Sequence, residues 1–121
     1  MTLNEYQEKA MTTCLPTSEN FSYMMLNLVG EVGEFASKVG KHIRKGNACI
    51  EHNKLQLTGE NWCVNDEELE ELQKEAGDIL WQVSGLCSVM GWSLEDVAQQ
   101  NLDKLSSRKK RGVVDGSGDN R

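Results

Sequence analysis

The chain has 121 residues, of which 38% are hydrophobic, and its formal net charge is −6. This length suits one domain, and the acidic balance disfavours a nucleic-acid polymer or an anionic membrane as a partner. No apolar run approaches the ~20 residues of a membrane span, and MTLNEYQEKA lacks the basic-then-apolar layout of a signal peptide, so we expect a cytoplasmic protein.

Helices are predicted near residues 2–14, 18–45, 66–90 and 93–110. Thr2 and Glu5 form a capping-box pattern at the start of the first helix. Pro16 ends that helix, and Thr17 or Ser18 can cap the second one. Apolar residues in the two long helices recur at steps of three and four, which is typical of a helix bundle. These apolar series are Phe21, Met24, Met25, Leu28, Val32, Phe35, Val39 and Ile43, then Leu69, Leu72, Ala76, Ile79, Val83, Leu86 and Met90.

Residues 46–65 have no helical period and are interpreted as a loop with a short hairpin around Thr58–Gly59. The predicted fold class is all-α, as a four-helix bundle-type protomer. Because these helices make a thin core, we expect the bundle to be completed by dimerisation, as a dimer or a dimer of dimers. One domain is expected over residues 1–112, followed by a flexible, glycine-rich C-terminal tail over residues 113–121.

The four cysteines show no close pairing of the Cys-x-x-Cys kind. Cys14 and Cys87 fall in apolar helical phases, where a thiol behaves as a small buried hydrophobe. Cys49, His52 and Cys63 would make only a partial zinc set. Reduced thiols are therefore the favoured interpretation.

Two acidic pairs carry the strongest functional signal. Glu31 and Glu34 are three residues apart in one predicted helix, and Glu75 and Asp78 repeat this spacing in another. Each pair projects from one side of its helix, and each acid immediately precedes a residue of the apolar series. If the two series face each other, the four carboxylates converge at one edge of the contact.

Converging carboxylates repel one another in a partly desolvated site, so a cation must relieve them. Oxygen ligands select hard cations, which predicts Mg²⁺, with Mn²⁺ as a substitute. Gly30, Gly33 and Gly77 would let backbones or a ligand come close. The competing interpretations are solvated surface acids paired with lysines such as Lys38 and Lys74, and a di-iron centre, which the missing Glu-x-x-His pattern disfavours.

The stretches LVGEVGEFASKVGKHIRKG and ELQKEAGDILWQVSGLCSVMGWSLEDVAQQNLDKLSSRKKRG resemble the MazG-like nucleoside triphosphate pyrophosphohydrolases, which belong to the all-α NTP pyrophosphatase superfamily. The resemblance covers residues 20–112. It implies Mg²⁺-dependent cleavage of a (deoxy)nucleoside triphosphate into the monophosphate and pyrophosphate, as in housecleaning of the nucleotide pool. It also implies Glu31, Glu34, Glu75 and Asp78 as the catalytic metal ligands.

The last predicted helix offers partners for the phosphates. Asn101, Lys104 and Arg108 step along one face, so a single ligand could meet all three. The resemblance implies that an Asn and a Lys of this helix contact the nucleotide. The alternative is a polar surface stripe that complements the negative end of the helix. Lys38 is a weaker candidate, because Glu34–Lys38 is also an ordinary surface pair.

Base recognition, by resemblance, uses aromatic residues of the bundle and of the loop before the second acidic helix. Trp62 lies in that loop, and Trp81 and Gln82 lie one turn beyond Asp78, so these three are candidate base contacts. For each Trp the alternative is core packing. Better-known relatives have an aromatic residue where Gln82 stands, so their base preference is not transferred.

Three other functions compete with this interpretation. Phosphoribosyl-ATP pyrophosphohydrolase belongs to the same superfamily and is separable by testing that substrate. A non-catalytic, nucleotide-binding helical dimerisation module would have no need for four converging acids. A subunit of a larger assembly could use the tail as its contact.

Overall fold

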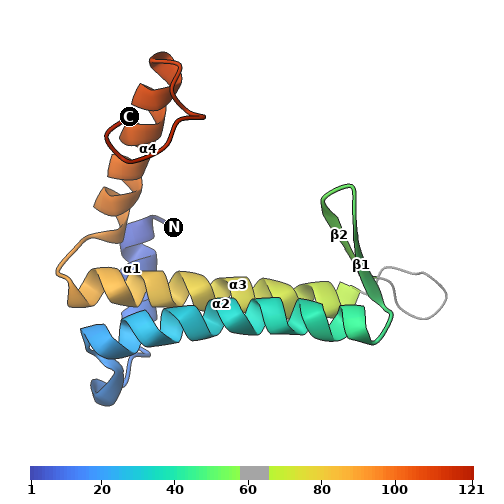
Figure 1. The fold of residues 1–121 in the computed structure, drawn as a ribbon. Coiled ribbons are helices and arrows are strands. Elements are labelled where there is room, and N and C mark those ends of the chain that lie inside the picture. The colour runs from blue at the N-terminus through green and yellow to red at the C-terminus, as the bar shows by residue number, and fades with distance from the viewer. Residues whose placement is uncertain (58–65) are drawn as a thin grey trace.

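The computed structural model describes residues 1–57 and 66–121, without the side chain of Asp66. Within these ranges the chain forms four α-helices and one two-stranded antiparallel sheet (Figure 1). A short 3₁₀ turn, Pro16–Ser18, precedes the second helix. The elements are α1 (Leu3–Met11), α2 (Phe21–Arg44), β1 (Ala48–Glu51), β2 (Lys54–Leu57), α3 (Asp66–Val89) and α4 (Leu94–Lys110).

The helix ends follow local capping chemistry. At α1 the Thr2 hydroxyl accepts a hydrogen bond from the Glu5 amide at 3.1 Å, and the Glu5 carboxylate accepts one from the Thr2 amide at 2.6 Å, which confirms the capping box. The cap of α2 is Asn20, whose side chain accepts from the Tyr23 amide at 2.8 Å. The prediction of Thr17 or Ser18 as this cap is wrong, because both residues lie in the 3₁₀ turn.

Helices α2 and α3 lie side by side and run antiparallel (Figure 1). Pairs of residues along the contact show the register: Asn27 meets Gln82, and Lys38 meets Glu75. Further along the same contact, His42 lies 3.4 Å from Glu68. Much of this contact is therefore polar, and polar side chains stand where a bundle ordinarily places apolar ones.

The buried line of each long helix follows the predicted apolar series only in part: Met24 and Leu72 are buried as predicted, but polar residues share the line. Glu75 and Gln82 are buried in α3, whereas Ala76 is exposed. In α2, Glu31 is partly buried, whereas Val32 is 50% exposed. The prediction that each acid lies beside the seam is wrong for Glu31 and Glu75, because these two acids belong to the contact itself.

The sheet is a hairpin whose turn is formed by His52 and Asn53. Both residues have positive φ, 51° and 60°, as a two-residue hairpin turn of the primed kind requires. The described residues are mostly helical, as the all-α prediction has it, with this small sheet added, and Thr58–Gly59, the predicted turn, lies outside the described residues. Phe35 and Val39 pack against Ala48, Leu57 and Leu72, which anchors the hairpin on the end of the α2–α3 pair.

Helix α1 packs on α3 and fixes where α4 begins. The Trp81 indole N–H donates to the Ala10 carbonyl at 3.1 Å and to the Thr13 hydroxyl at 3.0 Å. The Gln7 amide nitrogen donates to the Trp92 carbonyl at 3.0 Å, and its oxygen accepts from the Leu94 amide at 2.8 Å. These bonds hold the connection between α3 and α4.

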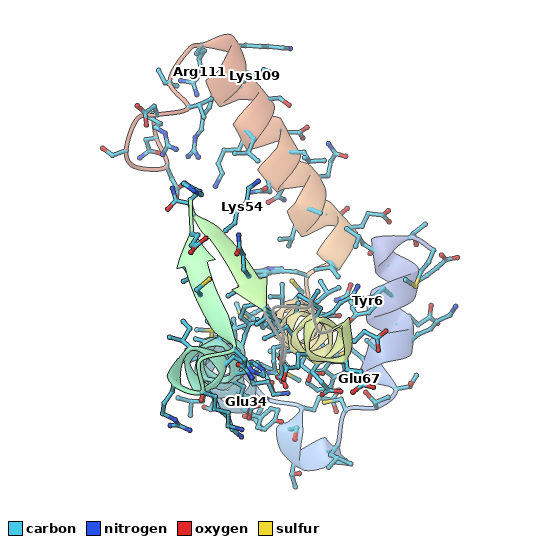
Figure 2. The ribbon with its side chains drawn as sticks, turned by 90° about the vertical axis from the view of Figure 1, so that its right-hand side faces the viewer. Tyr6, Glu34, Lys54, Glu67, Lys109 and Arg111 are labelled. Carbon is cyan, nitrogen blue, oxygen red and sulfur yellow. The ribbon has the colours of Figure 1, made fainter. Side chains whose placement is uncertain are left out.

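Helix α4 leads away from the α2–α3 pair, so the four helices do not form a closed bundle (Figure 1). In Figure 2, Lys109 and Arg111 mark its far end, well away from Glu34 on the helix pair. Large apolar side chains are left uncovered on both α2 and α4, including Leu26 at 75%, Val29 at 68% and Leu102 at 57% exposed. The prediction of a four-helix bundle-type protomer is therefore corrected to a helix pair with two flanking helices. Among the described helices, none is both long and apolar enough to cross a membrane.

One helix glycine permits close packing, and it is not one of those predicted. A Cβ on Gly85 would overlap the end of the Met24 side chain, so a larger residue here would force this fully buried methionine to move. At Gly33 and Gly77 a Cβ would meet nothing within 4 Å, and at Gly30 only the Asn27 side chain at 3.7 Å. Among the described residues, no backbone approaches these three glycines closely, and the part of the prediction that concerns a ligand stays a prediction.

Candidate metal centre between α2 and α3

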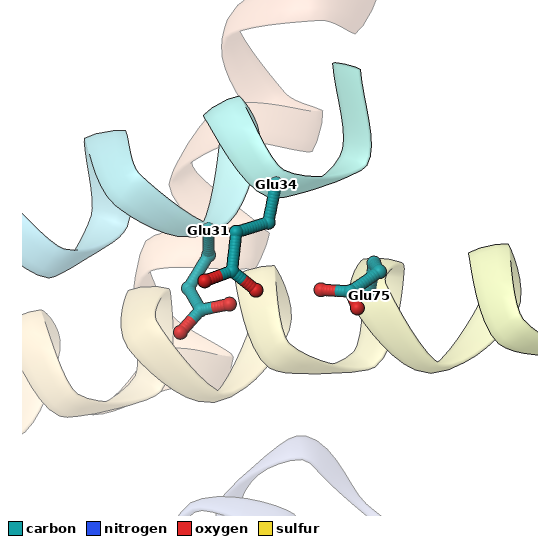
Figure 3. A group of neighbouring side chains, drawn as sticks. All are labelled: Glu31, Glu34 and Glu75. Atoms are coloured by element: carbon teal, nitrogen blue, oxygen red, sulfur yellow. The ribbon is translucent and has the colours of Figure 1, made fainter. Parts of the chain in front are cut away.

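Three carboxylates converge on the α2–α3 contact. Glu31 and Glu34 come from α2 and Glu75 from α3, and each offers one oxygen within 4.8 Å of the other two (Figure 3). Their position follows from the antiparallel register, which sets the middle of α2 against the middle of α3. A donor set made only of carboxylate oxygens suits a hard cation such as Mg²⁺ or Mn²⁺.

Glu75 gives the clearest sign of a missing partner. It is only 6% exposed, and its Oε2 atom is buried with no hydrogen-bond partner among the described residues. A buried carboxylate oxygen without a partner costs free energy of folding. A cation bound at this oxygen would remove that cost, so the residues of the site fit a cation. The other oxygen of Glu75 pairs with the Lys38 ammonium, whose pKa this hydrogen bond raises.

The carboxyl group of Glu31 has a raised pKa. Burial raises the pKa of its carboxyl, the negative charges of Glu34, Asp78 and Glu75 raise it further, and the hydrogen bond from Asn27 lowers it. A bound divalent cation would reverse this balance by favouring the ionised form.

The raised pKa of Glu31 predicts how the metal-free protein responds to pH. The folded chain holds the proton on the Glu31 carboxyl more tightly than the unfolded chain does. The stability that this difference contributes to the folded state is therefore fully present below the ordinary glutamate pKa. It is lost as pH rises through the raised value. We expect Glu31→Gln to remove that loss and to be more stable than the unsubstituted protein at neutral pH. Urea unfolding of both proteins in chelator, from about pH 4 to about pH 7, checks this, and a stability difference that does not change with pH would contradict it.

Asp78, the fourth predicted ligand, lies outside the group of three. Its side chain is exposed, and its charge acts on Glu31 in α2 and on Tyr6 in α1, whose pKa is raised mainly by burial and then by Asp78. Asp78 therefore borders the carboxylate cluster from the side on which α1 packs.

The predicted phosphate partners on α4 are not brought to the acids within one protomer. Lys104 and Arg108 instead face the returning residues 113–121, where Asp119 accepts from Arg108 at 3.0 Å and from Lys104 at 3.4 Å. Both cations lower the pKa of the Asp119 carboxyl. Asn101 and Lys104 line one shallow hollow with Val97 and Gln100. A carboxylate thus already lies between two of the residues predicted to bind phosphate.

Lys38, by contrast, lies at the acids. Besides its contact with Glu75, its ammonium is 3.8 Å from Glu71. A hollow on the surface of α2 is lined by Glu34, Ser37, Lys38 and Lys41. One acid of the cluster and two ammonium groups therefore share a surface where a phosphate chain could lie.

The candidate base contacts are placed differently from one another. Trp62 lies outside the described residues. Trp81 is partly buried and uses its indole N–H to hold α1. Gln82 is 1% exposed, and both ends of its amide are hydrogen-bonded inside the α2–α3 contact. The indole N–H of Trp81 and both ends of the Gln82 amide are therefore already hydrogen-bonded within the protein, and stacking of a base on Trp81 stays a prediction.

Asn27 is a residue of the site that the sequence analysis did not predict. Its side-chain nitrogen donates to Glu31 Oε1 at 3.1 Å and to Gln82 Oε1 at 2.7 Å, so it joins the carboxylate cluster to the buried interior. The available signal was its spacing, because Asn27 stands four residues before Glu31 on the same helix face.

The cysteines form no disulfide among the described residues, where Cys14, Cys49 and Cys87 are free thiols. Cys63 lies outside those residues. The Glu31–Glu34–Glu75 cluster is the one potential metal-binding group found over residues 1–57 and 66–121. In that part of the chain, Cys49 and His52 therefore do not belong to a group of three ligands.

Comparison with known proteins adds independent evidence. The family profile described as MazG nucleotide pyrophosphohydrolase domain matches residues 19–113, which includes both acidic helices and α4. The chain is also similar to the Gene 37 protein of Mycobacterium phage L5. The two are 42% identical over 103 residues, which is 85% of this chain and 78% of the phage protein. No solved structure matches the chain.

Proposed function

Since the chain belongs to the MazG nucleotide pyrophosphohydrolase family, we propose that it hydrolyses a (deoxy)nucleoside triphosphate to the monophosphate and pyrophosphate in a reaction that depends on Mg²⁺. Mn²⁺ is proposed as a substitute, and housecleaning of the nucleotide pool as the role. The observation that carries the proposal is the convergence of Glu31, Glu34 and Glu75, with a buried oxygen of Glu75 left unpartnered.

In this proposal Glu31, Glu34 and Glu75 hold the cation, and Asp78 completes the acidic set from the next turn of α3. A bound divalent cation supplies charge neutralisation on the phosphate oxygens and a more acidic water. Either Glu31 or Glu34 aligns that water and accepts its proton. The oxygen of the water bonds to the α-phosphorus, the bond from that phosphorus to the bridging oxygen breaks, and pyrophosphate leaves.

Lys38 has a second role in the same account. Its ammonium now pairs with Glu75 and so partly neutralises the acidic cluster. With Glu75 engaged by the cation, this ammonium becomes available to the phosphate chain, as does Lys41 across the same hollow. Ammonium groups are suited to this use because they contact phosphate as compact point charges.

The site is proposed to be completed by a second copy of the chain, in a dimer or a dimer of dimers. The exposed apolar residues of α2 and α4 have no covering partner among residues 1–57 and 66–121 of the protomer. A second copy that covers them would bring its own α4, with Asn101, Lys104 and Arg108, to the acids of the first copy. A phosphate group would then take the place that Asp119 holds between Lys104 and Arg108.

A screen for pyrophosphate release across the NTPs, dNTPs and phosphoribosyl-ATP tests the proposed activity. We expect release of pyrophosphate, rather than of phosphate alone, from at least one nucleoside triphosphate with Mg²⁺, and none with chelator. Equal rates with Mg²⁺ and with chelator would overturn the metal dependence. Cleavage of phosphoribosyl-ATP alone would identify the chain as a phosphoribosyl-ATP pyrophosphohydrolase, another member of the superfamily. Binding of nucleotide without cleavage of any substrate would identify it as a binding module.

A further inference from the structure

The Glu31 carboxylate is held from one side by a chain of amides. Asn27 Nδ2 donates to Glu31 Oε1 at 3.1 Å and to Gln82 Oε1 at 2.7 Å. Gln82 Nε2 in turn donates to the Met24 backbone carbonyl at 3.3 Å. The chain therefore runs from the backbone of α2, through a side chain of α3, back to a carboxylate of the proposed metal site on α2.

The Met24 carbonyl sets the direction of every bond in this chain. A carbonyl can only accept, so Gln82 must turn its NH₂ group towards it and its oxygen towards Asn27. Asn27 must then present its own NH₂ group, which has two hydrogens, one for Gln82 and one for Glu31. A flipped Asn27 would place an oxygen against two other oxygens. The donor that reaches Glu31 is thus fixed by a backbone atom.

Burial makes this arrangement hard to replace by water. Gln82 is 1% exposed and Met24 is fully buried. Gly85 leaves the space that Met24 occupies, since a Cβ there would overlap the end of the Met24 side chain. Hydrogen bonds are strengthened in such surroundings, and each amide group would be costly to leave unpaired.

The same arrangement opposes the repulsion within the carboxylate cluster. One oxygen each of Glu31, Glu34 and Glu75 lies within 4.8 Å of the other two, so without a donor the repulsion would leave Glu31 free to turn towards solvent. We propose that Asn27, oriented by the buried Gln82, is a positioning residue that holds Glu31 in place for the divalent cation. This inference rests on the proposed function and gives Gln82 a role other than base contact.

Mn²⁺ binding to the full chain, measured by calorimetry with the metal alone, tests the proposal. Two variants keep the overall shape of the side chain: Asn27→Leu retains the branched outline and removes the donor, and Gln82→Met retains the length and removes the group that orients it. Outer partners of metal ligands are typically worth about ten- to hundredfold in affinity. We expect a loss in that range for Asn27→Leu and a smaller loss for Gln82→Met. The KM for the nucleotide at saturating Mn²⁺ should change little.

Gln99→Ala is the matched control, because Gln99 donates to Asp103 at 2.9 Å in another amide–carboxylate pair of the same spacing, outside the site. It should leave Mn²⁺ affinity unchanged. An Asn27→Leu protein that melts earlier but binds Mn²⁺ as tightly as the unsubstituted chain would overturn the inference. If Asn27→Leu does not fold, the Mn²⁺ affinity of Gln82→Met is compared with that of the unsubstituted chain instead, and equal affinities would again overturn the inference. An unsubstituted chain that neither binds Mn²⁺ nor cleaves nucleotides would instead overturn the proposed function, and the inference with it.

Discussion

Replacing Glu34 by glutamine is expected to lower Mg²⁺-dependent pyrophosphate release by about a hundredfold or more. Loss of an outer partner of a metal ligand already costs about ten- to hundredfold, and Glu34 is proposed to touch the cation directly. Its side chain is exposed, so the substitution should leave the fold intact. Removing one of three clustered negative charges should also relieve repulsion in the metal-free state. Steady-state rates and thermal unfolding of the same preparation measure both effects.

The control for this experiment is Glu67→Gln on α3, an exposed acid outside the cluster (Figure 2). It makes the same change of charge and should retain the full rate. Asp78→Asn, made alongside, is expected to lose activity as well, since Asp78 is proposed as the fourth acid. Full turnover by Glu34→Gln under saturating Mg²⁺ would remove Glu34 from the mechanism.

Lys104→Ala is expected to reduce kcat/KM by about ten- to hundredfold, the usual value of a hydrogen bond to a charged group. Because Lys104 is proposed to act on the acids of a second copy, its loss should be complemented by a chain defective only in those acids. Co-expressed Lys104→Ala and Glu34→Gln chains form mixed dimers with one intact site each. Random pairing then restores roughly a quarter of the unsubstituted activity.

The matched control for complementation pairs Glu31→Gln with Glu34→Gln. Both changes fall in the same half of the proposed site, so no mixed dimer contains an intact one, and activity should stay at the level of the single variants. Native mass spectrometry confirms that mixed dimers are present. If they are present and Lys104→Ala with Glu34→Gln recovers nothing, the α4 residues do not serve the acids of a second copy.

The positions of the long helices and the meeting of acids were predictable because each depends on local pattern. Capping chemistry and helical period located α1 and α4 to within a few residues, and helical period alone did so for α2. The spacing of Glu31 and Glu34 placed them on one side of α2, and their meeting with Glu75 followed from the condition that α2 and α3 pack together. The seam was predicted only in part, because periodicity counts apolar residues whereas Glu75 and Gln82 occupy buried positions on α3. A polar contact is invisible to a hydrophobic pattern when its polar residues are paired with one another.

The position of the hairpin turn and the direction of α4 could not be predicted, for two different reasons. The hairpin turn uses His52 and Asn53 at positive φ, where sequence rules expect a glycine and so favoured Thr58–Gly59. The apolar residues of α4, such as Leu102 and Leu105, have the spacing of any packed helix. That spacing does not say whether the surface covering them belongs to the same chain or to another.

The most direct test is anomalous diffraction from crystals of the full chain grown with Mn²⁺ and a non-hydrolysable nucleoside triphosphate analogue. We predict a manganese peak coordinated by Glu31, Glu34 and Glu75, with the phosphate chain of the analogue bound to the same ion. A nucleotide bound with no manganese at these carboxylates, or manganese held only by other residues, would contradict the account.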